Sequence, residues 1–379
     1  MDFLGRLKKF GISLFKKEGS IIGLDIGSSA VKLIELERRG GKTHLLSYGT
    51  LALGPYANDD PGKVARLSNE KLVEAITTLF TATGSKGRRG GVSIPLKLSL
   101  IVTIEVPEST EAKLATVVPL EARKYIPVPP SEVNIDWSVV SRPESRSLSQ
   151  VKKEDAASST GAPEKIRVLV AAIHNSTIES YQELAAKIHL SPALFEIETF
   201  SAIRAVLKEE HGTFALLDIG SEVSKIIIID YGSINFSHMI NRGSQALTNA
   251  VAEALHIPFK EAESVKRGGF SGVHEGISLA PILTPGVETI ILEVKKVIDD
   301  FEHKEYKKIE KMICIGGGAT IPGLATMAKN LLQKEVVLGD PFVGIDLPLS
   351  APKVVERIRE GGPEYAVAMG IALRALEEL

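Results

Sequence analysis

The residues best suited to chemistry lie in two copies of a short motif, LDIGS, which begin at Leu24 and Leu217. In each copy an Asp ends an apolar run and is followed by a Gly and a Ser. Glycine permits a tight turn, so successive backbone N–H groups and the serine hydroxyl can form a cradle for an anion. The carboxylate can hold Mg²⁺ through water molecules. The residues expected to grip phosphates from two sides are Asp25, Gly27, Ser28 and Ser29 in the first copy and Asp218, Gly220 and Ser221 in the second, with Asp25 and Asp218 near the metal.

The motifs belong to a longer internal repeat. LDIGSSAVKLIEL aligns with LDIGSEVSKIIII, and in the first copy the pattern predicts a strand at 21–26, a glycine turn and a second strand at about 31–37. One copy in each half of the chain indicates two homologous halves rather than a short-period solenoid. A single motif of this kind is more often an ordinary Asp-Gly turn, but two related hairpins that face each other favour a shared binding site.

Two further segments could complete such a site. Gly316, Gly317 and Gly318 follow a strand-like run and precede a helix, so a phosphate or sugar could approach the backbone there. In EAESVK, Glu263 and Lys266 are three residues apart and share a helix face, where they could border a ribose and an adenine. Each signal has a simpler alternative. A lone glycine triplet is often a flexible connection, and a Glu–Lys pair is often a surface ion pair.

Composition narrows the class of protein. The chain has 379 residues, 44% of them hydrophobic, and a formal net charge of -2, so no overall basic field exists to bind nucleic acid. A single cysteine, Cys314, excludes an internal disulfide framework and fits a cytoplasmic setting.

The basic amphipathic segment 1–19 either lies on an anionic membrane surface or is a frayed N-terminal segment with a solvated charged face. The polar stretch 141–164 predicts a flexible loop.

The order of these elements resembles the actin-like ATPase superfamily and, within it, the PilM family of type IV pilus assembly proteins. The proline-rich stretch discriminates best, since DIGS and GGG occur throughout the superfamily. The segments that carry the resemblance are GLDIGSSAVKLIEL at 23–36, EARKYIPVPPSEVNIDW at 121–137, EAESVKRGG at 261–269, IGGGATIPGL at 315–324 and AVAMGIALRA at 366–375.

The resemblance implies an α/β fold of the actin-like (ribonuclease H-like) type, with two lobes and an FtsA-type inserted subdomain. The first lobe core would comprise 20–96, 191–212 and 345–379, with the inserted subdomain at 97–190. The second lobe core would comprise 213–242 and 310–344, with a small subdomain at 243–309.

The resemblance also implies ligands and partners. ATP and Mg²⁺ would sit between the lobes. The short cytoplasmic N-terminal tail of PilN, an inner-membrane protein, would bind in a groove beside the inserted subdomain and link the chain to other inner-membrane pilus components. We expect a cytoplasmic protein, held peripherally at the inner membrane. The candidate groove residues are Ile126, Pro127, Val128, Pro129 and Pro130.

Two alternatives remain on the same fold. A small-molecule kinase would need a base for the acceptor hydroxyl, and no separate Asp motif between the hairpins clearly supplies one. An FtsA-like division protein would carry its amphipathic membrane helix at the C-terminus, whereas here the Phe- and Lys-rich stretch is at 1–19. Ser221, Glu222 and Ser224 replace the threonine-rich loop of fast ATPases, so we expect slow hydrolysis at most.

Overall fold

The computed structural model describes residues 19–141, 165–191, 193–207, 212–347, 355–356, 358 and 361–378. The predicted amphipathic segment, except for Gly19, and the predicted flexible loop, except for Ser141, lie outside these residues. Within the described ranges, no helix combines the length and the apolar character needed to cross a membrane.

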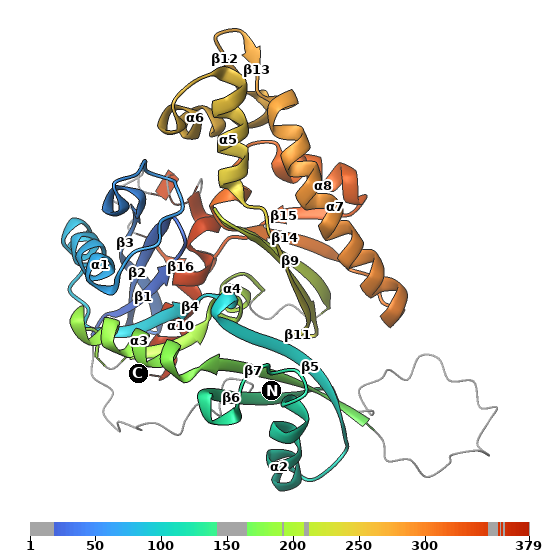
Figure 1. Cartoon of the computed structure of the whole chain (residues 1–379). Coiled ribbons are helices and arrows are strands. Elements are labelled where there is room, and N and C mark those ends of the chain that lie inside the picture. Colours follow the sequence, from blue (N-terminus) through green and yellow to red (C-terminus); the bar gives the residue numbers. More distant parts are fainter. Residues whose placement is uncertain are drawn as a thin grey trace.

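The first lobe is built on a six-stranded sheet of order β16-β3-β2-β1-β4-β8 (Figure 1). Its strands are β1 (Ile21–Ile26), β2 (Ala30–Arg39), β3 (Lys42–Ala52), β4 (Arg89–Ile94), β8 (Ala193–Ile197) and β16 (Ile345–Asp346). Helices α1 (Asn69–Thr83) and α3 (Asn175–Lys187) pack on one face, and α10 (Ala366–Glu378) packs on the other. Because both faces are covered, β1 is buried along its whole length, which explains its continuous apolar run.

Helix α1 begins where the sequence supplies a cap. The Ser68 hydroxyl accepts a hydrogen bond from the backbone N–H of Lys71 at 3.4 Å. We expect Ser68→Ala to lower the free energy of unfolding by about 1 kcal/mol, since an uncapped N-terminus leaves a backbone donor without its partner. Urea unfolding would measure the loss. Thr77→Ala, at an exposed position inside the same helix, is the control and should not destabilise.

The second lobe repeats this topology with a five-stranded sheet of order β11-β10-β9-β14-β15. In both lobes an antiparallel meander of three strands is extended by two parallel strands, so the repeat seen in the sequence extends to the fold. The strands are β9 (Thr213–Ile219), β10 (Ser224–Asp230), β11 (Ser233–Ile240), β14 (Lys311–Ile315) and β15 (Glu335–Leu338). The helices are α5 (Ser244–Leu255), α6 (Phe259–Lys266), α7 (Ala280–Glu305) and α8 (Leu324–Leu332).

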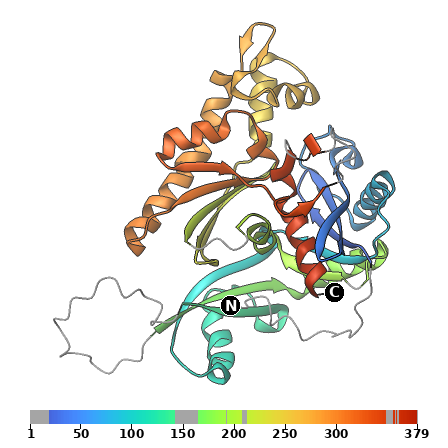
Figure 2. The ribbon, with the colours of Figure 1, turned by 180° about the vertical axis from the view of Figure 1, so that it is seen from behind.

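The two lobes meet through a shared core. Helix α4 (Glu198–Leu207) connects them and packs closely on α10, where a Cβ at Gly370 would lie 1.7 Å from the Ser201 carbonyl oxygen. Figure 2 shows α10 from behind, running beside the first sheet to the C-terminal end. At the far end of the second lobe, β12 (Val273–His274) and β13 (Ile277–Ser278) form a small hairpin.

A separate three-stranded sheet of order β5-β7-β6 is inserted after β4 (Figure 1). Its strands are β5 (Ser99–Pro107), β6 (Val133–Ser141) and β7 (Lys165–His174), and α2 (Glu111–Ala122) packs on it around a core of its own. Helix α3 follows β7 directly but packs on the first-lobe sheet through Leu184 and Ala185. We therefore propose that the inserted subdomain ends at His174, earlier than the expected residue 190.

Candidate functional site

A cavity of about 1630 Å³ lies between the turns of the two DIGS hairpins. Every one of the twelve residues predicted to contact a nucleotide lines it: Asp25, Gly27, Ser28, Ser29, Asp218, Gly220, Ser221, Glu263, Lys266, Gly316, Gly317 and Gly318. The residues predicted for the peptide groove, 126–130, lie elsewhere, between α2 and β6. The chain thus brings four distant segments to one cleft and keeps the proline segment apart from it.

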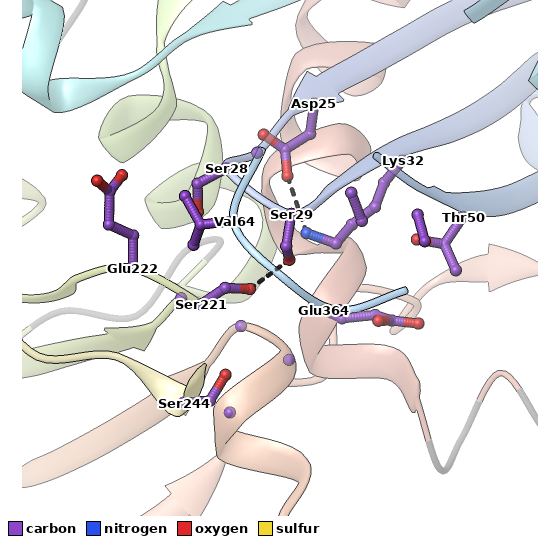
Figure 3. A pocket seen from close by; sticks show the side chains of 18 of the residues that line it. Asp25, Ser28, Ser29, Lys32, Thr50, Val64, Ser221, Glu222, Ser244 and Glu364 are labelled. Atoms are coloured by element: carbon purple, nitrogen blue, oxygen red, sulfur yellow. Dashed lines mark hydrogen bonds and ion pairs between the residues drawn. The ribbon is translucent and has the colours of Figure 1, made fainter. Parts of the chain in front are cut away.

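The two hairpin turns have the same backbone geometry. Gly27 donates its N–H to the Ala30 carbonyl at 3.0 Å, and Gly220 donates to the Val223 carbonyl at 3.1 Å. The hydroxyls of Ser29 and Ser221 are hydrogen-bonded to each other across the cleft, so the loops of the two lobes meet (Figure 3). Two glycine turns that converge from opposite lobes provide backbone donors on both sides of one small volume.

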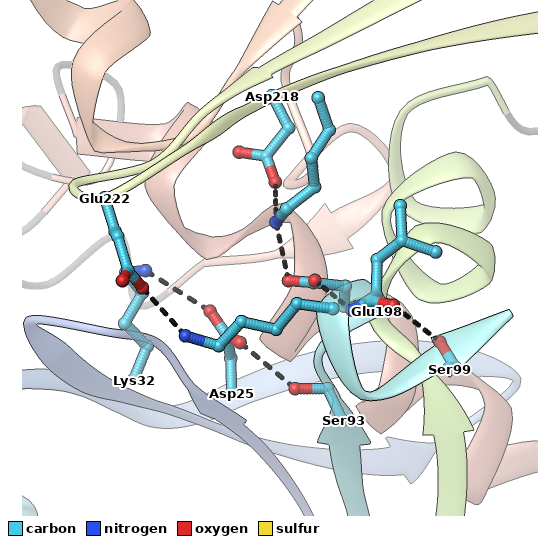
Figure 4. Close-up of polar contacts among 10 residues, drawn as sticks. Asp25, Lys32, Ser93, Ser99, Glu198, Asp218 and Glu222 are labelled. Carbon is cyan, nitrogen blue, oxygen red and sulfur yellow. Dashed lines mark hydrogen bonds and ion pairs between the residues drawn. The ribbon is translucent and has the colours of Figure 1, made fainter. Parts of the chain in front are cut away.

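Each DIGS aspartate is paired with a lysine on the next strand of its own hairpin. Lys32 Nζ lies 3.2 Å from Asp25 Oδ2, and Lys225 Nζ lies 2.9 Å from Asp218 Oδ2 (Figure 4). Asp25 also accepts a hydrogen bond from the Ser93 hydroxyl at 3.0 Å. Both carboxylates are therefore buried with compensated charge, which is the condition under which buried ions are tolerated.

Glu198, at the start of α4, ties the site to the rest of the molecule. Its Oε2 lies 2.8 Å from Lys225 Nζ, and its Oε1 accepts the backbone N–H of Leu96 at 2.5 Å. Burial raises the pKa of Glu198 despite the nearby Lys225 ammonium. Burial lowers the pKa of Lys225, but Asp218 and Glu198 outweigh it, so the net pKa is raised and this lysine is charged at neutral pH. With both oxygens engaged, Glu198 is held in a fixed orientation.

A further carboxylate, Glu364, lies near Lys32 of the first hairpin. Glu364, just before α10, lines the cavity, and burial raises the pKa of its carboxyl. For Lys32, burial lowers the pKa, but Asp25 and Glu364 together overcome that effect and raise it. The first hairpin therefore also presents a half-buried cation, Lys32, near two carboxylates.

Close contacts explain why two residues of the triplet, Gly316 and Gly318, are glycine. Gly316 has φ +83°, and a Cβ there would lie 2.4 Å from Asp218 Oδ1. A Cβ at Gly318 would lie 2.3 Å from Ile219 Cγ2. Side chains at these positions would collide with the second DIGS loop, so the backbone itself forms this wall of the cavity.

Glu263 and Lys266 form an ion pair in which Lys266 is buried and Glu263 is half-buried. Lys266 Nζ lies 2.6 Å from Glu263 Oε2 and 2.8 Å from the Thr248 hydroxyl, and burial lowers the pKa of this lysine. The ammonium is thus fully engaged by α5 and α6. It fixes the orientation of Glu263 beside the cavity.

Several residues of the site were not predicted: Lys32, Lys225, Glu198, Glu364 and the cavity-lining residues of segment 61–67. Asp25 faces Lys32 and Asp218 faces Lys225 in the antiparallel registers. Since directly opposed residues point to the same face of a sheet, hairpin register could have revealed both pairs. Glu198 and segment 61–67 carry no comparable local signal.

The donor set fits magnesium held through water and phosphate. No group of three or more His, Cys, Asp or Glu that could cage a metal occurs in the part of the chain that the structure describes. The two aspartates line one cavity, and each has an oxygen engaged by a lysine. Magnesium keeps several waters and commonly takes its other ligands from phosphates, so such a pair can orient a hydrated ion.

The proline segment has a buried and an exposed part. Ile126 packs into the core of the inserted subdomain, so its side chain cannot contact a partner unless that core opens. Pro127 and Pro129 are exposed, Val128 is half-buried, and Pro130 begins a 3-10 turn. Ile126 therefore does not belong to the exposed surface predicted to contact the partner.

Cys314 is buried in β14, and burial raises the pKa of its thiol to about 12, as expected for an inert cysteine.

Comparisons with known proteins agree with this architecture. A family model described as type IV pilus assembly protein PilM matches residues 23–376. The cell division protein FtsA of Streptococcus pneumoniae is 22% identical over 386 residues, covering 88% of this chain and 79% of the relative. FtsA of Enterococcus faecalis is 21% identical, covering 88% and 82%.

Two solved structures share the fold. A structure titled PilM-PilN type IV pilus biogenesis complex superposes with a TM-score of 0.74 and 23% identity, covering 95% of this chain and 99% of that one. The ethanolamine utilization protein EutJ from Carboxydothermus hydrogenoformans has a TM-score of 0.53 and 18% identity, covering 94% and 90%. The expected two-lobed actin-like fold with an inserted subdomain is confirmed.

Proposed function

We infer a function in two parts, because this chain belongs to the PilM family of type IV pilus assembly proteins. The first part is binding of ATP with Mg²⁺ in the cleft between the lobes. The second is capture of the cytoplasmic N-terminal tail of PilN by the inserted subdomain, which holds the protein at the cytoplasmic face of the inner membrane beside other pilus components.

One observation carries the nucleotide part of the proposal. Residues predicted from four separate segments, in both halves of the chain, line a single cavity in which the two glycine turns face each other. A duplicated Asp-Gly turn with only a structural role would not require this convergence. A polyphosphate bound in this cavity would be approached by backbone donors from both sides, and the two facing turns provide that arrangement.

The chain's own residues have distinct roles in this proposal. Bound magnesium would neutralise part of the phosphate charge. Asp25 and Asp218 would orient its water shell, and backbone and hydroxyl groups at 27–29 and 220–221 would hold the phosphates. The open backbone at 316–318 would admit the sugar, and Glu263, fixed by Lys266, would border the adenosine. Glu198, pinned by Lys225 and Leu96 N, is poorly placed as a mobile base, which supports slow hydrolysis at most.

Calorimetric titration of ATP, with and without Mg²⁺, tests the nucleotide part directly. Turnover of ATP should then be followed with sugars, glycerol and acetate as acceptors. Acceptor-dependent stimulation would favour the kinase alternative over an assembly protein. No stimulation, together with saturable binding, is the expected result.

The partner part rests on family membership and on the exposed proline segment. The structurally similar complex is described by its title as one between PilM and PilN. In this chain, Pro127 and Pro129 present a rigid surface between α2 and β6. Fixed backbone torsions lower the conformational entropy that a docking surface loses on binding.

We expect the double substitution Pro127→Glu and Pro129→Glu to reduce capture of the PilN tail by about tenfold or more while ATP affinity is unchanged. Binding of the tail would then remove water from two carboxylates that have no partner. The binding free energy lost for each is at least that of one hydrogen bond to a charged group. Pull-down with the synthetic tail, alongside calorimetry with ATP, measures both effects. Glu293→Lys, at an exposed site on α7, is the control. Undiminished capture by the double variant would show that the segment is misassigned.

A further inference from the structure

Glu222, which follows Ser221 in the second phosphate-facing loop, holds two cations that come from the other lobe. Lys97 Nζ lies 2.7 Å from its Oε2, and Arg66 Nη2 lies 3.5 Å from its Oε1. All three residues line the cavity. Glu222 directly follows Ser221, whose hydroxyl contacts Ser29 (Figure 3), so the loop that carries Glu222 is the one that meets the first hairpin.

The backbones that carry the two cations are anchored at the site. Ala65, next to Arg66, donates its N–H to the Ser28 carbonyl at 2.9 Å. Leu96, next to Lys97, donates its N–H to Glu198 at 2.5 Å. The side chains themselves are long and solvent-facing, with exposed fractions of 87% for Arg66 and 43% for Lys97. Fixed backbones with exposed cationic ends allow a partner to be exchanged without rearranging the fold.

The ion pairs that Arg66 and Lys97 form with Glu222 are weak. Exposed ion pairs contribute little to stability, because water screens them and ordering two long side chains is unfavourable. The Lys97 hydrogen bond lowers the pKa of Glu222, so this carboxylate is ionised at neutral pH. A terminal phosphate placed between Ser29 and Ser221 would carry more charge than one carboxylate and present more acceptor oxygens. It would also repel Glu222.

We propose that Arg66 and Lys97 recognise the terminal phosphate of ATP and that Glu222 holds them in its absence. The inference rests on the proposed binding of ATP in this cleft and adds the residues that discriminate ATP from ADP. Glu222 acts as an internal competitor: it weakens the preference for ATP and keeps the cations near the site. Arginine can hold a phosphate through two parallel hydrogen bonds, and lysine adds a point charge.

The test compares ATP and ADP affinities, each with Mg²⁺, by calorimetry. The double variant Arg66→Ala and Lys97→Ala should bind ATP about tenfold or more weakly, as expected for lost hydrogen bonds to a charged group, with ADP affinity changed by less than about twofold. Glu222→Gln should shift the ATP/ADP preference in the opposite direction by at least about threefold, since it removes the competing charge. Lys71→Ala and Lys295→Ala, at exposed ion pairs on α1 and α7, are the matched controls.

Equal losses for ATP and ADP in the double variant would overturn the proposal, as would an unchanged ratio in Glu222→Gln. A wild-type protein that binds neither nucleotide would overturn the proposed function itself. One that binds both, with a ratio insensitive to these substitutions, would overturn only the assignment of Arg66, Lys97 and Glu222.

Discussion

Asp25→Asn is expected to remove the magnesium dependence of ATP binding. Asn keeps the size of the side chain and can still accept the 3.0 Å hydrogen bond from Ser93, so the buried hairpin should remain folded. It lacks the charge that would orient a hydrated cation. For the wild-type protein we expect Mg²⁺ to tighten ATP binding by about tenfold or more, the scale of one charge-assisted contact, and for the variant by less than about twofold.

The ratio of ATP dissociation constants in EDTA and in Mg²⁺, measured by calorimetry, is the relevant quantity. The affinity in EDTA alone is less informative, because Asp25→Asn also frees Lys32 to attract phosphate. Asp299→Asn, in an exposed ion pair on α7, is the control. If Asp25→Asn kept the full magnesium effect while remaining folded, the metal would not lie near the first DIGS loop.

Glu196→Gln is expected to cause a large loss of stability. Glu196 Oε1 lies 2.8 Å from Arg374 Nη1, and both Glu196 oxygens lie 2.7 Å from guanidinium nitrogens of Arg204. Glu196 and Arg374 are buried, so neutralising the acid leaves Arg204 without its carboxylate partner and Arg374 with Glu378 alone, 2.9 Å from its Nε. We expect the free energy of unfolding to fall by about 3–5 kcal/mol.

Urea unfolding at pH 7 would measure that loss. Glu74→Gln, in an exposed pair on α1, is the control and should change the free energy of unfolding by less than about 1 kcal/mol.

The stabilisation by Glu196 should also depend on pH in a defined direction. Burial raises the pKa of Glu196, but Arg204 and Arg374 outweigh burial and lower it overall. The stabilisation is therefore complete above the ordinary glutamate pKa of about 4.3 and is lost as pH falls through the folded-state value. The difference between wild type and variant should shrink in acid; a constant difference would contradict this explanation.

The parts of the fold that could be predicted from sequence are those set by local pattern. The continuous apolar run of β1 and the glycine turn after Asp25 specify a hairpin, and the second copy at Leu217 specifies its repeat. Recurrence of the motif also predicted that distant loops share a site, since homologous halves place equivalent turns at equivalent edges. For Gly316 and Gly318, the close approach to Asp218 and Ile219 supplies the physical reason for glycine.

The remaining features depend on contacts between segments that lack a shared motif. Glu198 is an ordinary acidic residue in sequence, and only the packing of α4 brings it within 2.8 Å of Lys225. Alternation along one strand does not settle the direction of Lys32 or Lys225, whereas pairing across the hairpin does. The proline neighbours of Ile126 predict a partner surface, but the turn after α2 directs the Ile126 side chain into the subdomain core.

The central claim is that loops from two duplicated lobes enclose one triphosphate, and a crystal structure of the chain with ATP and Mg²⁺ tests it most directly. The account predicts that the phosphates lie between residues 27–29 and 220–221 and replace the Ser29–Ser221 hydrogen bond, with the adenosine beside Glu263. Nucleotide bound outside this cleft, or an intact Ser29–Ser221 contact at full occupancy, would contradict it.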